Sequence, residues 1–296
     1  MKANFHMNTT LLENNRTSHT DSIGCLLCGE SRHVPWSREN GYTAVKCASC
    51  GLVYVNPRPV MSLISAGVET GVHNELQHGR TAITYRAGRK VTLYKNIIAS
   101  VFADVWEERS PIAWLDVGAG FGEIVEAVST LAAPESTVEG VEPMRPKAEH
   151  AKARGLAVRE GYLSDVDGQF DFLSLVNVFS HIPDFHGFLE DAKNALKPEG
   201  EIFIETGNIG DLVSHHQVPT DLDLPDHLVF AGEQNMRDFL TKAGFSIISI
   251  ERRRKDGLIN AAKNIVRKAL GRHVTLAIPY TSAYRTLLIR AKLFPR

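Results

Sequence analysis

The most informative stretch of this chain is Trp114-Leu115-Asp116-Val117-Gly118-Ala119-Gly120-Phe121-Gly122-Glu123-Ile124. Residues 113–117 are apolar enough for a buried strand, and helical spacing of apolar residues begins at Ile124. The three glycines between them permit a tight turn and leave backbone N–H groups open to a ligand. The stretch therefore predicts a strand, a glycine turn and a helix that together cradle a ligand.

The spacing of the glycines narrows the class of ligand. A dinucleotide turn of the form G-x-G-x-x-G would place its third glycine at position 123, which is Glu. An acid at the start of the helix would repel a pyrophosphate but would tolerate a cationic ligand without phosphate. The pattern Asp-x-Gly-x-Gly-x-Gly resembles the first motif of class I S-adenosylmethionine-dependent methyltransferases. The resemblance implies S-adenosylmethionine at Asp116, Gly118, Ala119, Gly120, Phe121 and Gly122.

Further cofactor contacts follow from the same resemblance. A predicted strand at residues 136–141 ends at Glu142-Pro143, where a carboxylate can accept both hydroxyls of a ribose. The family resemblance gives Glu142 that role, with Pro143 beside it. It places the adenine against Tyr162 or Leu163, and it puts the exit of the fourth strand, with Asn177 and Phe179, beside the cofactor.

Strands and helices alternate from residue 111 onward, which predicts a parallel sheet with ligands at the carboxyl ends of its strands. By analogy with the family, the last strand, residues 285–293, runs antiparallel beside the sixth, residues 244–250. The expected fold is α/β: a Rossmann-like, seven-stranded methyltransferase sheet with helices on both faces, preceded by a small zinc ribbon. The expected divisions are a disordered N-terminus (1–21), the ribbon (22–60), a helical lid or linker (61–110) and the methyltransferase domain (111–296), with a basic amphipathic insertion at 252–282.

All four cysteines fall into two C-x-x-C pairs, Cys25/Cys28 and Cys47/Cys50, with 18 residues between the pairs. This spacing is typical of a four-thiolate zinc site, and a closed thiolate set leaves no open position for catalysis. We therefore expect a structural Zn²⁺. The segment CASCGLVYVNPRP at 47–59 resembles the second knuckle of zinc-ribbon methyltransferases, many of them from sugar, polysaccharide and natural-product pathways.

Two histidines are candidates for the catalytic base, since a hydroxyl nucleophile must lose a proton and histidine titrates near neutral pH. His181 follows the fourth strand, with Asp184 available to orient it, although a structural role in bonding a nearby loop is the alternative. His227 lies in a segment that borders the substrate pocket in similar proteins. The loop at 207–224, which contains His215 and His216, is long enough to act as a substrate lid.

Charge is unevenly distributed along the chain. From Arg252 onward there are 12 Lys/Arg and one acid, whereas the preceding 251 residues hold 21 basic and 33 acidic side chains. The segment at 257–272 is amphipathic, with Leu258, Ala262, Ile265 and Ala269 along one face and Lys263, Arg267 and Lys268 opposite. We expect its apolar face to dock on the domain. Contact with anionic lipid, and hence a lipid-linked substrate, is the alternative.

The acidic body argues against a broad nucleic-acid interface. With no run of 18 apolar residues and no secretory signal, a cytoplasmic location is expected, with the inner face of the membrane as the site of any peripheral contact. The expected function is O-methylation of a sugar, glycan or related small metabolite. The alternatives are C-methylation of a nucleotide-linked keto sugar, RNA methylation, and a non-catalytic binding protein that keeps the fold.

Overall fold

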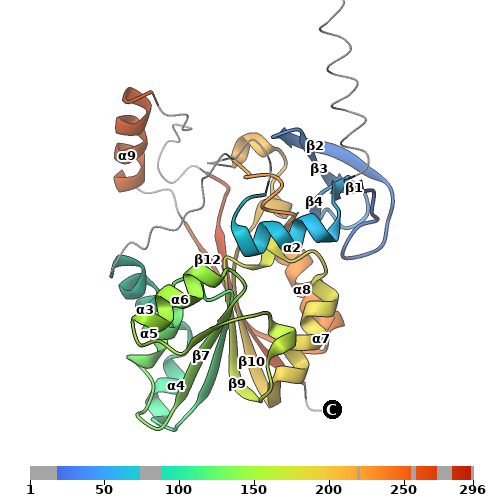
Figure 1. Ribbon diagram of the computed structural model, residues 1–296. Helices are drawn as coiled ribbons and strands as arrows, with labels where there is room; N and C mark the ends of the chain where they lie inside the picture. The colour runs from blue at the N-terminus through green and yellow to red at the C-terminus, as the bar shows by residue number, and fades with distance from the viewer. Residues whose placement is uncertain (1–18, 74–87, 219–220, 255–257, 272–281, 295–296) are drawn as a thin grey trace, which may run out of the picture.

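The computed structural model describes residues 19–73, 88–218, 221–254, 258–271 and 282–294. The expected disorder of residues 1–21 falls mostly outside these ranges. A seven-stranded sheet with the order β12-β13-β10-β9-β6-β7-β8 forms the centre of the molecule (Figure 1). Its strands are β6 (Ala113–Val117), β7 (Thr137–Glu142), β8 (Val158–Glu160), β9 (Phe170–Val176), β10 (Leu196–Gly207), β12 (Phe245–Arg253) and β13 (Thr286–Leu293).

The direction of the strands confirms the predicted fold class. Strand β13 pairs antiparallel with both β10 and β12, while the pairs from β10 through β8 are parallel. Parallel strands place their carboxyl ends at one edge, so the turns after β6, β7 and β9 meet there. Strand β10 begins at Leu196, and its register with β9 shifts between Leu196 and Glu201.

Helices cover both faces of the sheet (Figure 1). One face carries α3 (Arg89–Val101), α4 (Ala103–Glu108), α5 (Glu123–Ser129) and α6 (Arg145–Ala153). The other carries α7 (Phe185–Ala195) and α8 (Glu233–Lys242). On the first face, Phe102 contacts the rings of Trp114, Phe172 and Phe203, which project from three central strands. This aromatic cluster fixes α3 and α4 over the sheet.

A second sheet, of four strands, has the order β11-β4-β3-β2. Its first three strands along the chain are β2 (His33–Glu39), β3 (Tyr42–Cys47) and β4 (Val53–Val55), and β1 (Thr20–Asp21) pairs separately with β5 (Arg58–Pro59). The fourth strand, β11 (Val229–Phe230), comes from the segment after the predicted substrate loop and pairs antiparallel with β4. The ribbon sheet therefore includes two residues from the methyltransferase part of the chain. Helix α2 (Met61–Thr70) follows the ribbon.

The ribbon packs against the methyltransferase core. Leu27 and Leu52 belong to the same buried cluster as Phe239 of α8. The Asn235 side chain donates to the carbonyl of Cys50, with 2.7 Å between nitrogen and oxygen. These contacts make the ribbon part of the hydrophobic core.

The loop predicted as a substrate lid is held by the ribbon. Lys46 Nζ donates to the carbonyls of Gly210 (2.9 Å) and Leu212 (2.8 Å). The carboxylate of Glu39 accepts from the backbone N–H groups of Leu222 and Asp223, both at 2.8 Å. Two turns of 3₁₀-helix, η3 (Ile209–Asp211) and η4 (His215–Gln217), give the loop local structure. None of the helices in the described part of the chain is long and apolar enough to cross a membrane.

Candidate active site and metal centre

The glycine turn joins β6 to α5 in the predicted way. Gly118, Gly120 and Gly122 all have positive φ values, of 70°, 57° and 81°. A Cβ on Gly118 would lie 2.5 Å from Val178 Cγ2, whereas a Cβ on Gly120 would meet nothing closer than Glu123 Oε2 at 3.7 Å. The turn therefore needs glycine for its backbone conformation, and its Gly120 side opens onto free space. That open side is a cradle of the kind an adenosyl cofactor needs.

Glu142 at the tip of β7 faces this turn. Its Oε2 accepts from the Gly120 N–H at 2.7 Å, and its Oε1 accepts from the Met144 N–H at 3.0 Å. Only 5% of Glu142 is exposed. A carboxylate has about four acceptor positions, so Glu142 retains the capacity to accept from ribose hydroxyls while holding the two strand ends together.

Asp116 lies behind the turn, in the sheet. It is 2% exposed, and its Oδ1 accepts from the Ser174 hydroxyl at 2.6 Å. Ser174 Oγ in turn accepts from Trp114 Nε1 at 2.9 Å. Burial raises the pKa of Asp116 to about 8, against the opposing effect of the Ser174 hydrogen bond. Asp116 thus belongs to a buried polar chain that fixes β6 against β9.

Helix α3 covers the same end of the sheet through a residue that the sequence did not single out. Burial raises the pKa of Tyr94 to about 12, with the nearby carboxylates of Glu205, Glu123 and Asp116 acting in the same direction and a hydrogen bond with Asn177 opposing it. Tyr94 therefore lies over the ends of β6, β9 and β10. Its partners come from distant segments, so no local pattern in the sequence could have found it.

Tyr162 and Leu163, the two residues expected to contact the adenine, have different surroundings in the structure. Leu163 is 5% exposed and belongs to the main core, whereas Tyr162 is 40% exposed and donates from its hydroxyl to Glu69 Oε1 of α2 at 3.1 Å. Phe179 is fully buried, with its ring 4.7 Å from that of Phe185. Both side chains belong to the main hydrophobic cluster, and their cofactor contacts stay predictions. Both residues begin short 3₁₀ turns, η1 (Leu163–Asp165) and η2 (Phe179–His181), and their side chains point into the core.

The remaining predicted cofactor residues lie at the open end of the sheet. Ala119 and Phe121 have buried side chains, so their backbone faces the turn, and Pro143 is half-buried at the tip of β7. Asn177 has a positive φ of 59° and donates its backbone N–H to the carbonyl of Glu205. It also lines a cavity at this end of the sheet.

This cavity has a volume of about 100 Å³. It is lined by Asn177, Ser180, Thr206, Gly207, Ile209, His227, Val229, Phe230 and Tyr284. The wall mixes hydroxyl, amide and imidazole groups with aliphatic and aromatic surface, and none of its described residues is Lys or Arg. Such a wall suits a neutral group with hydroxyls on an apolar frame. His215 and His216 do not line it.

The two candidate bases have different surroundings. His227 lines the cavity, and its Nδ1 lies 2.7 Å from the carbonyl oxygen of Leu222. Because a carbonyl only accepts, Nδ1 carries the proton and Nε2 holds the free lone pair. Burial lowers the pKa of His227, and His181 lowers it further. His227 is thus a neutral imidazole with one basic nitrogen beside the cavity.

His181 lies one ring away and is tied to Asp226. The ring centroids of His181 and His227 are 4.7 Å apart. His181 Nδ1 and His73 Nε2 each lie 2.9 Å from Asp226 Oδ1. Burial by itself would raise the pKa of Asp226, but the hydrogen bonds from His181 and His73 lower it strongly. Asp226 is therefore an anion that holds two histidines in place.

Potential metal ligands gather in two places among the described residues. One is the group His181, Asp226 and His227, whose ligand atoms lie within 4.8 Å of one another. The Nδ1 atoms of both His181 and His227 already take part in hydrogen bonds. This arrangement suits proton transfer better than metal binding.

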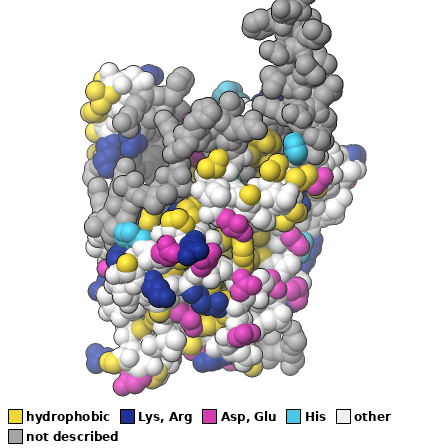
Figure 2. All heavy atoms as spheres, viewed as in Figure 1, with side chains coloured by type: hydrophobic (Ala, Val, Ile, Leu, Met, Phe, Trp, Pro, Cys, Tyr) yellow, Lys and Arg dark blue, Asp and Glu magenta, His cyan; other side chains and the backbone are white. Residues whose placement is uncertain are grey.

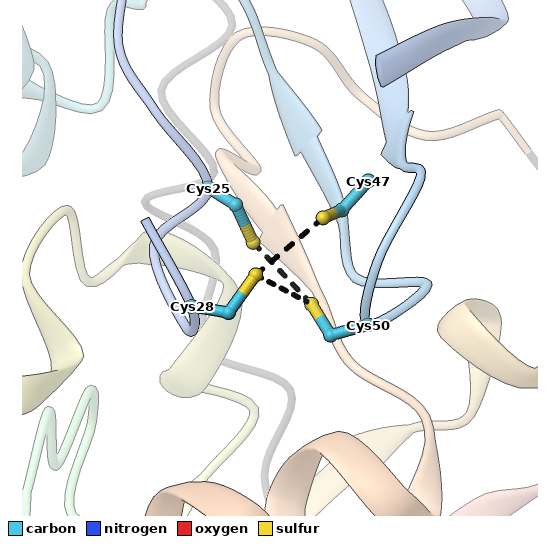
Figure 3. Close-up of side chains that lie close together, drawn as sticks. All are labelled: Cys25, Cys28, Cys47 and Cys50. Atoms are coloured by element: carbon cyan, nitrogen blue, oxygen red, sulfur yellow. Dashed lines mark hydrogen bonds between the residues drawn. The ribbon is translucent and has the colours of Figure 1, made fainter. Parts of the chain in front are cut away.

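The second place is the cysteine cluster (Figure 3), in which the sulfur atoms of all four cysteines point toward one centre. The Sγ atoms of Cys25 and Cys50 are 3.4 Å apart, and Cys28 Sγ is 3.6 Å from those of Cys47 and Cys50. Tetrahedral zinc with bonds of about 2.3 Å would separate its sulfurs by about 3.8 Å. The Ser49 N–H also points at Cys47 Sγ, at 3.4 Å. The four residues thus fit the predicted ligand set.

Comparison with known proteins settles the family. The profile of a methyltransferase-domain family matches residues 88–250. The chain belongs to this methyltransferase family. Ubiquinone biosynthesis O-methyltransferases are similar in sequence: that of Actinobacillus pleuropneumoniae is 32% identical over 108 residues, which are 32% of this chain and 45% of the relative. That of Pseudomonas paraeruginosa is 29% identical over 112 residues, 34% of this chain and 48% of the relative.

The chain thus matches less than half the length of these two curated relatives. Among solved structures, the 1,6-didemethyltoxoflavin-N1-methyltransferase of Burkholderia thailandensis, with bound 1,6-didemethyltoxoflavin and S-adenosylhomocysteine, has a TM-score of 0.51 at 16% identity. The match covers 88% of this chain and 99% of that one. At this identity the similarity shows the Rossmann-like methyltransferase fold. The family match adds that residues 88–250 form a methyltransferase domain.

Proposed function

We propose that the protein transfers a methyl group from S-adenosylmethionine to a hydroxyl group of a sugar, glycan or related small metabolite. The observation that supports this most is His227, a neutral imidazole beside a small cavity of mixed polarity at the sheet's ligand-binding end. A hydroxyl acceptor needs such a base. The wall without Lys or Arg fits an uncharged acceptor group.

The proposed chemistry needs little more than alignment and a proton acceptor. Bound S-adenosylmethionine supplies a methyl group that its sulfonium already activates. The acceptor oxygen forms the new bond to the methyl carbon as the carbon–sulfur bond breaks, and the hydroxyl proton passes to His227 Nε2. Asp226 holds His181 against the His227 ring, so His181 acts as a positioning residue. This arrangement favours His227 over His181 as the base.

The cofactor would be held mainly by main-chain groups and one carboxylate. The open Gly120 side of the turn accommodates its bulk, and Glu142 offers acceptors for the ribose. Asn177 lines the cavity, and we assign the exposed ring of Tyr162 to the adenine side.

We also propose that Cys25, Cys28, Cys47 and Cys50 hold one structural Zn²⁺, on the basis of their mutual sulfur distances. Four thiols kept as metal ligands suit a reducing compartment, which supports a cytoplasmic location.

A second acceptor class has support from the relatives, which are named for O-methylation in ubiquinone biosynthesis. A ring hydroxyl of a quinone-type precursor would also need His227. Both classes can be tested together, by incubating the protein with S-adenosylmethionine labelled in its methyl group and panels of glycosides, nucleotide sugars, polyprenyl-linked sugars and dihydroxybenzenes.

Label transfer to a sugar hydroxyl, lost in His227→Gln, is the expected result. Transfer only to dihydroxybenzenes would move the assignment to the second class. Transfer to carbon or nitrogen atoms, or to no panel member by a protein that binds S-adenosylhomocysteine, would contradict the proposal.

A further inference from the structure

Helix α9 (Leu258–Ala269) has no function in the site described above. It lies between β12 and β13 and stands away from the sheet and its covering helices (Figure 1). Its large apolar side chains are open to solvent: Leu258 is 70% exposed, Ile265 and Val266 are each 59% exposed, and Leu270, directly after the helix, is 72% exposed. Figure 2 shows hydrophobic side chains along the outer edge of this helix, with basic ones close by.

The expectation that this face docks on the domain is therefore wrong. Among the described residues, none from α9 belongs to any of the four hydrophobic clusters. An amphipathic helix gains most of its stability by burying its apolar face. A contiguous exposed apolar face, such as that of α9, marks an interaction surface.

The charges of α9 indicate what this surface meets. Successive residues of an α-helix are rotated by about 100° around its axis. In α9 this rotation places the large apolar residues on one half of the helix and Lys263, Arg267 and Lys268 on the other. The helix contains no acid. Arg252 and Arg253 just before it are different, because they pair with Glu233 and Glu251. Within the described structure, no such ion pair neutralises the three basic side chains of α9.

We propose that α9 binds the surface of an anionic lipid bilayer, with its apolar face among the acyl chains and its basic side chains among the headgroups. The helix is about 18 Å long, and its basic polar face and apolar half match the pattern of helices that lie in a membrane interface. A polyanion such as RNA would leave the apolar face in water. A second copy of the helix would cover that face but would bring like charges together.

The charge of the rest of the chain sets the orientation of binding. The 251 residues before the basic segment carry 12 more acidic than basic side chains, so an anionic surface repels them. The protein then approaches the bilayer through α9, and the methyltransferase core stays in water. This inference does not depend on the identity of the acceptor or on catalysis.

The test is co-sedimentation of the full chain with vesicles. One set contains one-third phosphatidylglycerol in phosphatidylcholine, and the other contains phosphatidylcholine alone. We expect binding to the anionic vesicles that weakens at high salt. Each basic side chain contributes about fivefold to such binding, so the combined change of Lys263, Arg267 and Lys268 to Gln should weaken it about a hundredfold. Ile265→Asp should abolish it.

Matched controls separate these effects from general changes of charge or polarity. The change of Arg145, Lys147 and Lys152 of α6 to Gln removes the same net charge and should leave vesicle binding within a few fold of wild type. Val34→Asp replaces another exposed apolar residue, 56% exposed on β2, and should also leave it unchanged. Binding of S-adenosylhomocysteine, measured on every variant, shows that the protein is folded.

Four outcomes would overturn the inference. The folded wild type could fail to sediment with anionic vesicles. The α6 variant could lose binding as much as the α9 variant, which would assign the effect to overall charge. Dimers in lipid-free buffer that Ile265→Asp dissociates would assign the apolar face to a second copy, and binding of RNA that ignores Ile265→Asp would assign the basic face to a nucleic acid.

Discussion

At the scale of single residues, the chemistry of the site depends on the protonation states of its titratable groups, which their surroundings determine. Burial lowers the pKa of His227 and raises the pKa of Asp116, because burial disfavours the charged form of either group. Both are therefore held neutral near pH 7, one as a base and the other as a structural acid. Each displacement leads to a pH-dependent measurement.

The first prediction concerns His227→Gln. Removing a general base should lower kcat by roughly 10²- to 10⁴-fold, while S-adenosylhomocysteine binding measured by calorimetry stays near wild type. In the wild type, only the neutral imidazole is a base, so kcat/KM should fall with decreasing pH through a value below the ordinary pKa of about 6.5. His186→Gln, on the exposed side of α7, is the matched control. Equal kcat for His227→Gln and wild type would remove His227 as the base.

The second prediction concerns Asp116→Asn in the ligand-free protein. The pKa of Asp116 is about 8 in the folded protein and about 3.9 in the unfolded chain. The favourable contribution of Asp116 to the free energy of unfolding is therefore complete below pH 4 and is lost as the pH rises to 8. Urea unfolding of wild type relative to Asp116→Asn should therefore show a relative loss of stability between pH 5 and pH 8. Parallel stability profiles for the two proteins would mean that Asp116 is already ionised in the fold.

At the scale of elements, the sequence predicted the Rossmann-like part well because its signals are local. The strand before Gly118 and the glycine spacing each lie within a dozen residues, and both gave the correct element. Long-range partnerships were not predictable in this way. Nothing in Val229-Phe230 indicates that these two residues complete the ribbon sheet. Similarly, the side chain of Phe179 follows a 3₁₀ turn into the core, which strand periodicity does not anticipate.

The third prediction tests the glycine turn as an element. Gly120→Arg places a side chain in the open side of the cradle, on a residue with φ of 57°, and should abolish S-adenosylhomocysteine binding. Gly155→Arg is the matched control, because Gly155 has φ of 81° and open space around it but lies after α6. Both variants should retain one zinc per chain by elemental analysis. Loss of zinc from Gly120→Arg alone would show that the two sites are coupled.

At the scale of the whole molecule, the ribbon and the methyltransferase sheet share one hydrophobic cluster. Two of the four clustered cysteines, Cys25 and Cys47, are part of that cluster, as are Phe239 and Phe245. The clustering of the four cysteines was predictable from their spacing alone. The packing of the ribbon into the core was not predictable, because each contact joins residues far apart in the chain, such as Asn235 and Cys50.

The fourth prediction follows from this shared core. Removing the metal with a chelator, or replacing a ligand by Cys47→Ser, should lower the melting temperature of the whole chain in one cooperative transition. Acceptor turnover should fall more than S-adenosylhomocysteine binding, because Val229 and Phe230 line the cavity and pair with β4, whereas the glycine turn lies elsewhere. Circular dichroism and calorimetry on the same samples measure both. Two separate thermal transitions would contradict a shared core.

Because β11 pairs with β4, the cavity and the proposed metal site are structurally linked. Two of the residues that line the cavity are strand partners of the ribbon, so under the proposed function acceptor specificity depends on the ribbon and its metal. A chimera that exchanged only the first 60 residues would bring a foreign ribbon against a native β11 and would disturb the cavity. Exchange of acceptor preference between relatives therefore requires the ribbon together with residues 208–231, and zinc starvation should silence methyl transfer before it releases the cofactor.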